Sequence, residues 1–188
     1  VIGGDMDIYL GTASAALRAN GQGTNIQIFG SVVTQYASNM VLQGDIAEKA
    51  GLTAESSMED RLAVLKGLKI GVTGSGSGTH QLALYMLERA GLDPDKDATV
   101  VFVGGSREVL AAFERDRIDA FILSNPTSDT AIMRNDAFLL FDMAGGQVED
   151  LNGYLYISMI ANGDWLAEDP ERSAAIIRAV GKALQAIH

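Results

Sequence analysis

One segment constrains the fold more than any other, because a short apolar strand runs through a glycine- and serine-rich loop directly into a periodic helix. The spacing of apolar residues predicts the strand over 69–73 and the helix over 78–90. The loop between them, Gly74-Ser-Gly-Ser-Gly-Thr79, presents backbone N–H groups and hydroxyls at a helix N-terminus. The helix macrodipole favours a negative or strongly polar ligand group at such a position.

The loop differs from the two common phosphate-binding motifs. A Walker A motif needs a lysine and a Ser or Thr after its last glycine, where this chain has Thr79 and His80. In the dinucleotide fingerprint the third glycine would fall at Thr79 or Gln81. Two interpretations therefore stay open: a ligand-binding loop, or a tight strand-to-helix turn capped by Ser or Thr.

The strand–helix pattern repeats immediately downstream. An apolar strand is predicted over 100–103, a helix over 107–115 and a further strand over 118–123. Two successive strand–helix units with short loops imply right-handed crossovers and a parallel sheet. The predicted fold class is therefore α/β.

The rest of the chain predicts additional elements around this core. A polar, helix-tolerant stretch from residue 45 to 66 is interpreted as a surface insertion or connector without an assigned role. A short helix is expected over 15–19, and Asp169-Pro170 marks the start of a C-terminal amphipathic helix. Further strands are expected over 5–10, 26–29, 38–43, 138–141 and 154–158.

The chain also contains an internal echo. The segment 5–10 resembles 117–123, and each runs into a small polar loop, at 11–14 and at 124–128 respectively. The echo is either a chance similarity of two short strands or a sign of two similar lobes. In the second case each lobe presents Ser and Thr at the carboxyl ends of its strands, where open α/β sheets bind ligands.

Composition excludes several classes of protein. A chain of 188 residues with 47% hydrophobic content can bury a sizeable core. The formal net charge of −10 opposes a broad nucleic-acid or anionic-membrane surface. The sequence contains no cysteine, so thiol catalysis, Cys-ligated zinc and disulfides are excluded. No apolar run approaches the ~20 residues that span a bilayer, so direct membrane insertion is not expected.

Catalytic and metal-binding patterns are weak. Of the two histidines, His188 ends the chain and His80 is expected in the first turn of a helix, as an exposed spectator that could still touch a ligand. Ser75 and Ser77 have no evident His–Asp partners. The alternating acids at 93–97 fit a solvated turn better than a calcium loop. We therefore predict no catalytic residues, no metal site and no cofactor.

Several ordered segments resemble a known family, namely Leu65–Val72, Gly74–Thr79, Ala90–Pro94 and Ile118–Ala120. They look like the periplasmic solute-binding proteins of ABC importers for nitrate, sulfonates, taurine and thiamine-precursor pyrimidines. The resemblance implies a periplasmic-binding-protein type II-like fold with two α/β lobes and a two-stranded hinge. Lobe one would comprise 1–36 and 142–188, lobe two 45–138, and the hinge 37–44 and 139–146. The N-terminal part of lobe one is expected to be missing, because family members begin with further elements.

The resemblance implies a function as well. The protein would be an extracytoplasmic receptor, exported to the periplasm, that captures a small polar or anionic metabolite between its lobes and delivers it to an ABC permease. The ligand would be a sulfonate, nitrate, a carboxylate or a pyrimidine-like compound, and the protein would not be an enzyme. The family's ligand loops correspond here to Thr12, Ser14, Ser75, Gly76, Ser77, Gly78, Thr79, Ser106, Ser124 and Asn125.

A regulatory protein is the alternative. The effector-binding domain of LysR-type transcription regulators has a similar two-lobed architecture and polar cleft. A basic helix-turn-helix would precede such a domain, and these 188 residues contain none. A signal peptide upstream would favour the importer component, whereas a DNA-binding helix pair would favour the regulator.

Overall fold

The computed structural model describes residue 1 and residues 3–187. The chain divides into two compact units: unit 1 consists of Val1–Tyr36 and Asn152–His188, and unit 2 consists of Ala37–Leu151. Each unit is an α/β assembly with its own sheet. The lobe and hinge boundaries implied by the family resemblance stay a prediction.

Unit 2 is built on a five-stranded mixed sheet with the order β5-β4-β6-β3-β7. Strand β4 pairs in parallel with both β5 and β6, which confirms the parallel core expected from the two strand–helix units. Strand β3 adds an antiparallel part, since it pairs antiparallel with β6 and β7. The strands are β3 (Ser38–Leu42), β4 (Lys69–Val72), β5 (Thr99–Phe102), β6 (Ala120–Ser124) and β7 (Phe138–Phe141).

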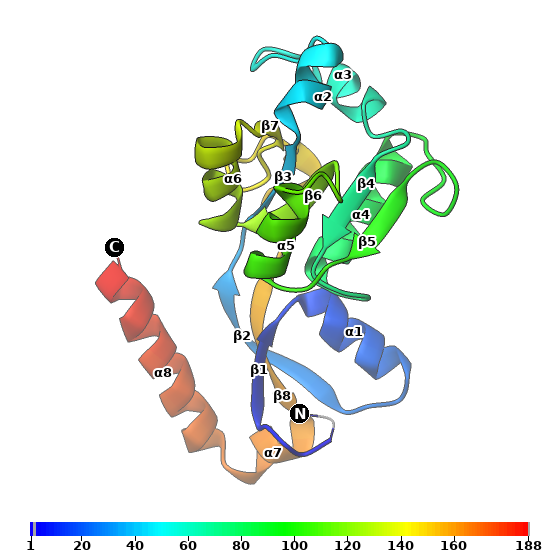
Figure 1. Ribbon diagram of the computed structural model, residues 1–188. Coiled ribbons are helices and arrows are strands. Elements are labelled where there is room, and N and C mark those ends of the chain that lie inside the picture. The colour runs from blue at the N-terminus through cyan, green and yellow to red at the C-terminus, as the bar shows by residue number, and fades with distance from the viewer. Residues whose placement is uncertain (2, 188) are drawn as a thin grey trace. The chain divides into compact units, whose positions relative to one another are not determined.

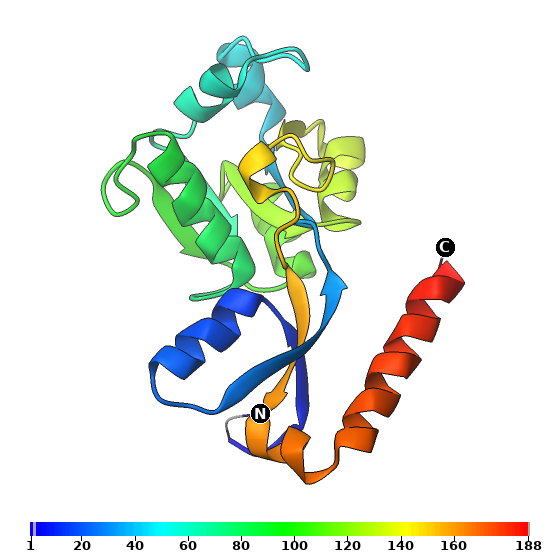
Figure 2. The same ribbon diagram turned by 180° about the vertical axis from the view of Figure 1, so that it is seen from behind.

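Helices cover both faces of this sheet: α5 and α6 lie on the face toward the viewer in Figure 1, and α4 lies on the other face, seen in Figure 2. Under α5, the rings of Phe113 and Phe121 meet edge to face with centroids 5.1 Å apart, at the centre of a buried apolar cluster. The helices of unit 2 are α2 (Gly44–Lys49), α3 (Met58–Ala63), α4 (Gly78–Arg89), α5 (Ser106–Phe113), α6 (Thr127–Asn135) and the short η1 (Glu149–Leu151).

The stretch 45–66 is more than the surface connector that its polarity predicts. It forms α2 and α3, and Arg61 of α3 is only 3% exposed. The five N–H groups of its guanidinium donate to backbone carbonyls at 2.8–3.0 Å, two of them on Leu139 and Leu140. The guanidinium also lies over the Phe138 ring, 5.1 Å from its centroid. Arg61 therefore attaches the segment to β7, a role that a charged residue in a polar stretch does not reveal.

Unit 1 contains a three-stranded antiparallel sheet with the order β1-β8-β2. The first helix packs on it through Ala16, which contacts Ile26 and Ile160. The C-terminal helix starts at Pro170 as predicted, and Asp169 Oδ1 accepts from Arg172 N–H at 3.0 Å. The elements are β1 (Ile8–Gly11), α1 (Ala13–Gly21), β2 (Ile26–Val33), β8 (Ile157–Asn162), α7 (Gly163–Glu168) and α8 (Pro170–Ile187).

The strand predicted over 154–158 is displaced, since β8 begins at Ile157. Tyr154 and Tyr156 belong instead to an aromatic cluster with Tyr36, whose ring centroid lies 5.4 and 4.3 Å from theirs. Burial raises the pKa of the Tyr36 hydroxyl far above its ordinary value, and the neighbouring tyrosines add to the shift. Tyr36 therefore stays neutral and serves packing.

Candidate functional site

The carboxyl ends of β4, β5 and β6 form the candidate site of unit 2. Because these strands are parallel neighbours, the loops that follow them meet at one edge of the sheet. Each loop leads into a helix, namely α4, α5 and α6. The fold thus brings to this edge the predicted ligand residues of unit 2, which are Ser75, Gly76, Ser77, Gly78, Thr79, Ser106, Ser124 and Asn125.

The glycine-serine loop is a closed turn that caps α4. Ser77 is the N-cap residue, and its Oγ accepts from His80 N–H at 3.1 Å while donating to the Gly74 carbonyl at 2.8 Å. Gly76 takes a φ of +74°, a conformation that side chains with a Cβ adopt only with strain. The Ser77 N–H donates to Gly74 O at 3.2 Å, so the loop uses this amide internally.

The Thr79 side chain connects this turn to Thr73, the residue that follows β4. Its hydroxyl is buried, accepts from Thr73 N–H at 3.0 Å, and lies within hydrogen-bond distance of the hydroxyls of Thr73 and Ser77. The hydroxyls of Ser77 and Thr79 thus hold the loop in shape. The Ser75 side chain is exposed at the tip of the turn. The capped turn is confirmed, and ligand binding at this helix N-terminus stays a prediction.

His80 supports the loop from the helix side. Its Nδ1 accepts from the Gly76 N–H at 3.0 Å, which assigns the ring proton of the neutral imidazole to Nε2. The ring meets Phe102 edge to face, with centroids 5.1 Å apart and an interplanar angle of 89°. The contact between His80 and Phe102 cannot be read from the sequence, because Phe102 lies on β5, far along the chain from His80 in α4.

Charge distinguishes α4 from the other helices at this edge. The first turn of α5 contains Glu108, and the first turn of α6 contains Asp129. A carboxylate there compensates the positive end of the helix dipole and repels a second anion. The first turn of α4 holds no acidic residue. The N-terminus of α4 is therefore the most favourable place for an anion among these three.

The loops beside α4 have more limited roles. Gly105 caps α5, and the Glu108 carboxylate reaches so close that a Cβ at Gly105 would lie 3.2 Å from its Oε2. After β6, the Ser128 hydroxyl donates to the Asn125 side-chain oxygen. Ser124 is the last residue of β6 and pairs with Ser38 of β3.

Unit 1 places its two predicted ligand residues at the start of α1. Thr12 is the N-cap residue, but its side chain makes no capping hydrogen bond; instead Thr12 Oγ1 accepts from the Ser14 hydroxyl at 3.1 Å. The first turn of α1 holds no acidic residue. The start of α1 therefore resembles the start of α4 in charge.

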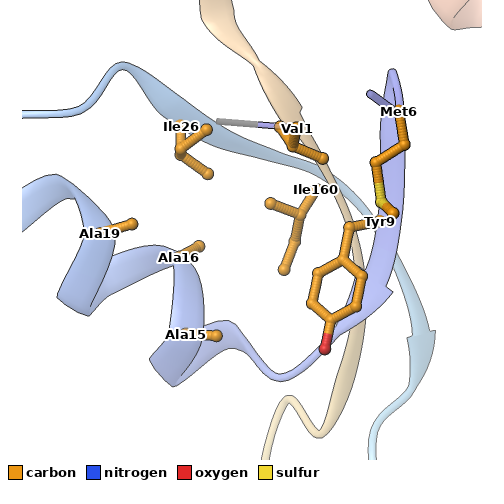
Figure 3. Close-up of a pocket in the computed structure, with 8 residues that line it drawn as sticks. All are labelled: Val1, Met6, Tyr9, Ala15, Ala16, Ala19, Ile26 and Ile160. Atoms are coloured by element: carbon orange, nitrogen blue, oxygen red, sulfur yellow. The ribbon is translucent and has the colours of Figure 1, made fainter. Parts of the chain in front are cut away.

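Unit 1 also contains an apolar pocket of about 250 Å³ between α1 and the sheet, shown in Figure 3. None of the predicted ligand residues lines it. Apart from the Tyr9 hydroxyl its walls are carbon and sulfur, so it offers an anion no compensation for lost hydration. The lining residues are Val1, Met6, Tyr9, Ala15, Ala16, Ala19, Ile26 and Ile160.

Across residue 1 and residues 3–187, no group of three or more His, Asp or Glu side chains could hold a metal ion. Within the same residues, no helix combines the length and the apolar character needed to cross a bilayer.

Comparison with solved structures defines the class of fold. A structure from Bordetella bronchiseptica RB50 has a TM-score of 0.80 at 21% identity, over 97% of this chain and 55% of that chain. The alkanesulfonate-binding protein SsuA from Xanthomonas axonopodis pv. citri, bound to MOPS, has a TM-score of 0.73 at 20% identity, over 97% and 56%. The periplasmic nitrate-binding protein NrtA from Synechocystis PCC 6803 has a TM-score of 0.73 at 16% identity, over 97% and 47%.

These similarities show a periplasmic-binding-protein type II-like α/β fold, and the chain spans about half the length of the solved proteins. The profile of the NMT1-like family matches residues 1–188, so the chain belongs to this family. The resemblance to periplasmic solute-binding proteins of the nitrate and sulfonate group is thereby confirmed. A comparison with curated proteins found no match.

Proposed function

We propose that the protein is an extracytoplasmic solute-binding receptor that captures a small polar or anionic metabolite and delivers it to an ABC permease. The absence of an acidic residue from the first turn of α4, at the carboxyl edge of the parallel strands, carries the proposal. Membership of the NMT1-like family supports it. SsuA and NrtA, which share the fold, are binding proteins for alkanesulfonate and nitrate.

In this proposal the head group lies at the N-terminal turn of α4. Backbone N–H groups of Gly78 and Thr79 and the exposed Ser75 hydroxyl face it, while Ser77 and the Thr79 side chain keep the turn in shape. Ser106, Ser124 and Asn125 lie at the same sheet edge, and within unit 1 Thr12 and Ser14 lie at the start of α1. Uncharged donors suffice, because backbone amides compensate an anion without a basic side chain.

The proposed role is binding without turnover, in the periplasm. SsuA and NrtA are binding proteins, and SsuA from Escherichia coli and NrtA are periplasmic. The regulator alternative receives no support from these neighbours.

A thermal-shift screen of the protein with sulfonates, nitrate, carboxylates and pyrimidines tests the proposal. At a ligand concentration of about one hundred times Kd, binding stabilises the folded state by about 2.7 kcal/mol, which raises Tm by several degrees. The absence of any shift, together with turnover of one of the compounds, would contradict a receptor.

The variant Gly78→Val localises the site, because it adds a branched side chain at the first residue of α4. We expect it to lower ligand affinity at least about tenfold through steric exclusion of the head group. Gly181→Val is the matched control, since a Cβ at Gly181 in α8 meets nothing within 4 Å. Equal affinities of the two variants would show that the loop does not line the site.

A further inference from the structure

One aromatic side chain beside the proposed anion position is exposed to solvent instead of being packed in the core. Phe102 ends β5 at the carboxyl edge and is 54% exposed. Its neighbours Val101 and Val103 face the other side of the sheet, where they pack against the buried cluster of unit 2. Because β5 is the edge strand, the Phe102 ring stands at the border of the sheet with one side open.

The orientation of this ring is fixed through the glycine-serine loop. Phe102 contacts the His80 ring edge to face, and His80 in turn accepts the Gly76 N–H. Both rings are therefore held in place before a ligand arrives, by contacts that reach into the loop itself. A prearranged apolar surface loses little conformational entropy when a ligand covers it.

We infer that Phe102, positioned by His80, is a specificity-determining residue that receives the carbon tail of an organic anion. The inference rests on the proposed function, because the head group must lie at the N-terminus of α4 for a tail to reach Phe102. An inorganic anion such as nitrate ends at its head group and leaves Phe102 exposed. The preferred substrate class is therefore an anionic group that carries an aliphatic or aromatic substituent.

The size of the effect follows from the apolar area that the tail covers. Covering about two methylene groups against the ring is worth roughly a tenfold gain in affinity. This gain is absent from a ligand whose anionic group carries only a methyl group. The discrimination thus concerns the length of the tail and leaves recognition of the head group unchanged.

Two matched ligand pairs test this inference by calorimetric titration: methanesulfonate with pentanesulfonate, and acetate with hexanoate. We expect the unmodified protein to bind the longer member of at least one pair roughly tenfold more tightly. Phe102→Ala should abolish this preference and leave the affinity for the shorter member unchanged. Met133→Ala, which truncates an 83% exposed side chain on α6, is the control and should keep the preference.

The outcomes separate the two proposals. If the anions bind but Phe102→Ala leaves the preference intact, or weakens both members of a pair equally, the inference is wrong and the receptor function stands. If Met133→Ala lowers the preference as much as Phe102→Ala does, the inference is also wrong. If none of the four probes binds the unmodified protein but nitrate or a pyrimidine does, the inference is wrong and the receptor function stands. If no compound of the thermal-shift screen binds either, both proposals are contradicted.

Discussion

The polar side chains of the glycine-serine loop have two different roles: some stabilise the conformation of the loop, and others face the proposed ligand. Ser77 and Thr79 direct their hydroxyls to partners inside the loop and to Thr73, directly after β4, so these two residues mainly fix where the amides of the first turn point. Preorganised donors bind an anion with little loss of conformational entropy. The side chain of Ser75 and the aromatic pair His80–Phe102 are then the groups through which ligands can be told apart.

The hydrogen bond from Gly76 N–H to His80 Nδ1 should contribute measurably to stability. We predict that His80→Ala lowers the free energy of unfolding by about 1 kcal/mol relative to Gln81→Ala, measured by urea denaturation. Both variants introduce alanine into the first turns of the same helix, so helix propensity largely cancels in the comparison. Equal stabilities would show that the bond to Gly76 does not contribute.

Arg61 should be among the most sensitive positions for folding. We predict that Arg61→Met lowers the free energy of unfolding by at least about 3 kcal/mol, because it removes all five hydrogen bonds that the buried guanidinium donates to backbone carbonyls. Arg61→Lys should be intermediate, since an ammonium group cannot reach all five.

The control for Arg61 is Arg178→Met, on the exposed side of α8. Arg178 is 62% exposed and its carboxylate partner Glu171 lies 4.0 Å away. We expect a change within about 0.5 kcal/mol in urea denaturation. A similarly small effect of Arg61→Met would contradict the role assigned to the buried guanidinium.

Among the helices and strands, the local sequence pattern was sufficient to predict an element where the apolar periodicity of that element was clear. The strands β4 and β6 and the helix α4 lie where the apolar periodicity predicts them, because short loops and parallel pairing add no competing signal. The pattern failed for α3, whose central charged residue suggested a solvated surface but is buried by tertiary contacts. It also misplaced β8, because the β-favouring Tyr154 and Tyr156 serve an aromatic cluster.

The candidate site, too, could be predicted from the sequence only in part. The loops after β4, β5 and β6 could be predicted, since carboxyl ends of parallel strands share one edge. Phe102 could not, because the run Val100–Val103 suggests a fully buried strand whereas β5 lies at the edge of the sheet. The order of strands in a sheet depends on long-range pairing that local periodicity does not encode.

One interaction between elements should make stability depend on pH. The hydroxyl of Tyr85 in α4 donates to Asp150 Oδ2 at 2.9 Å, and Arg89 forms an ion pair with the same carboxylate. These contacts lower the pKa of Asp150 below its ordinary value of 3.8. The charged form is favoured in the folded state, so its contribution is present above about pH 4 and is lost as the pH falls through the folded pKa.

The variant Asp150→Asn measures this contribution through Tm. We predict that the variant melts at a lower temperature than the unmodified protein at about pH 6, and that the difference shrinks as the pH is lowered below about 4. Because the Asp150 side chain is 61% exposed, added salt should reduce the difference. A difference that persists unchanged at the lower pH would contradict this assignment.

For the whole molecule, the net charge of −10 predicts an unusual salt dependence for a receptor of anions. A site built from lysine and arginine loses affinity as salt screens the attraction. Here the protein as a whole repels an anion, and the backbone amides at α4 act only at short range. We predict that raising the ionic strength from about 20 to about 200 mM leaves affinity unchanged or increases it, and that association becomes faster.

Stopped-flow measurements in sodium fluoride, whose small and strongly hydrated anion has neither a carboxylate nor a carbon tail, can test the salt effect. The control is the same titration in the zwitterion glycine betaine, which changes the solvent without screening. A marked loss of affinity with fluoride alone would indicate a basic binding site and would contradict recognition by amides.

Backbone amide shifts in a nitrogen–proton NMR titration test directly whether a small anion binds at the N-terminus of α4. On addition of a ligand found in the thermal-shift screen, we predict that the largest changes in unit 2 occur at the amides of residues 74–80, with smaller changes at Ser106, Ser124 and Asn125. Saturable binding that leaves residues 74–80 unchanged, and instead shifts residues lining the apolar pocket of unit 1, would contradict anion binding at α4.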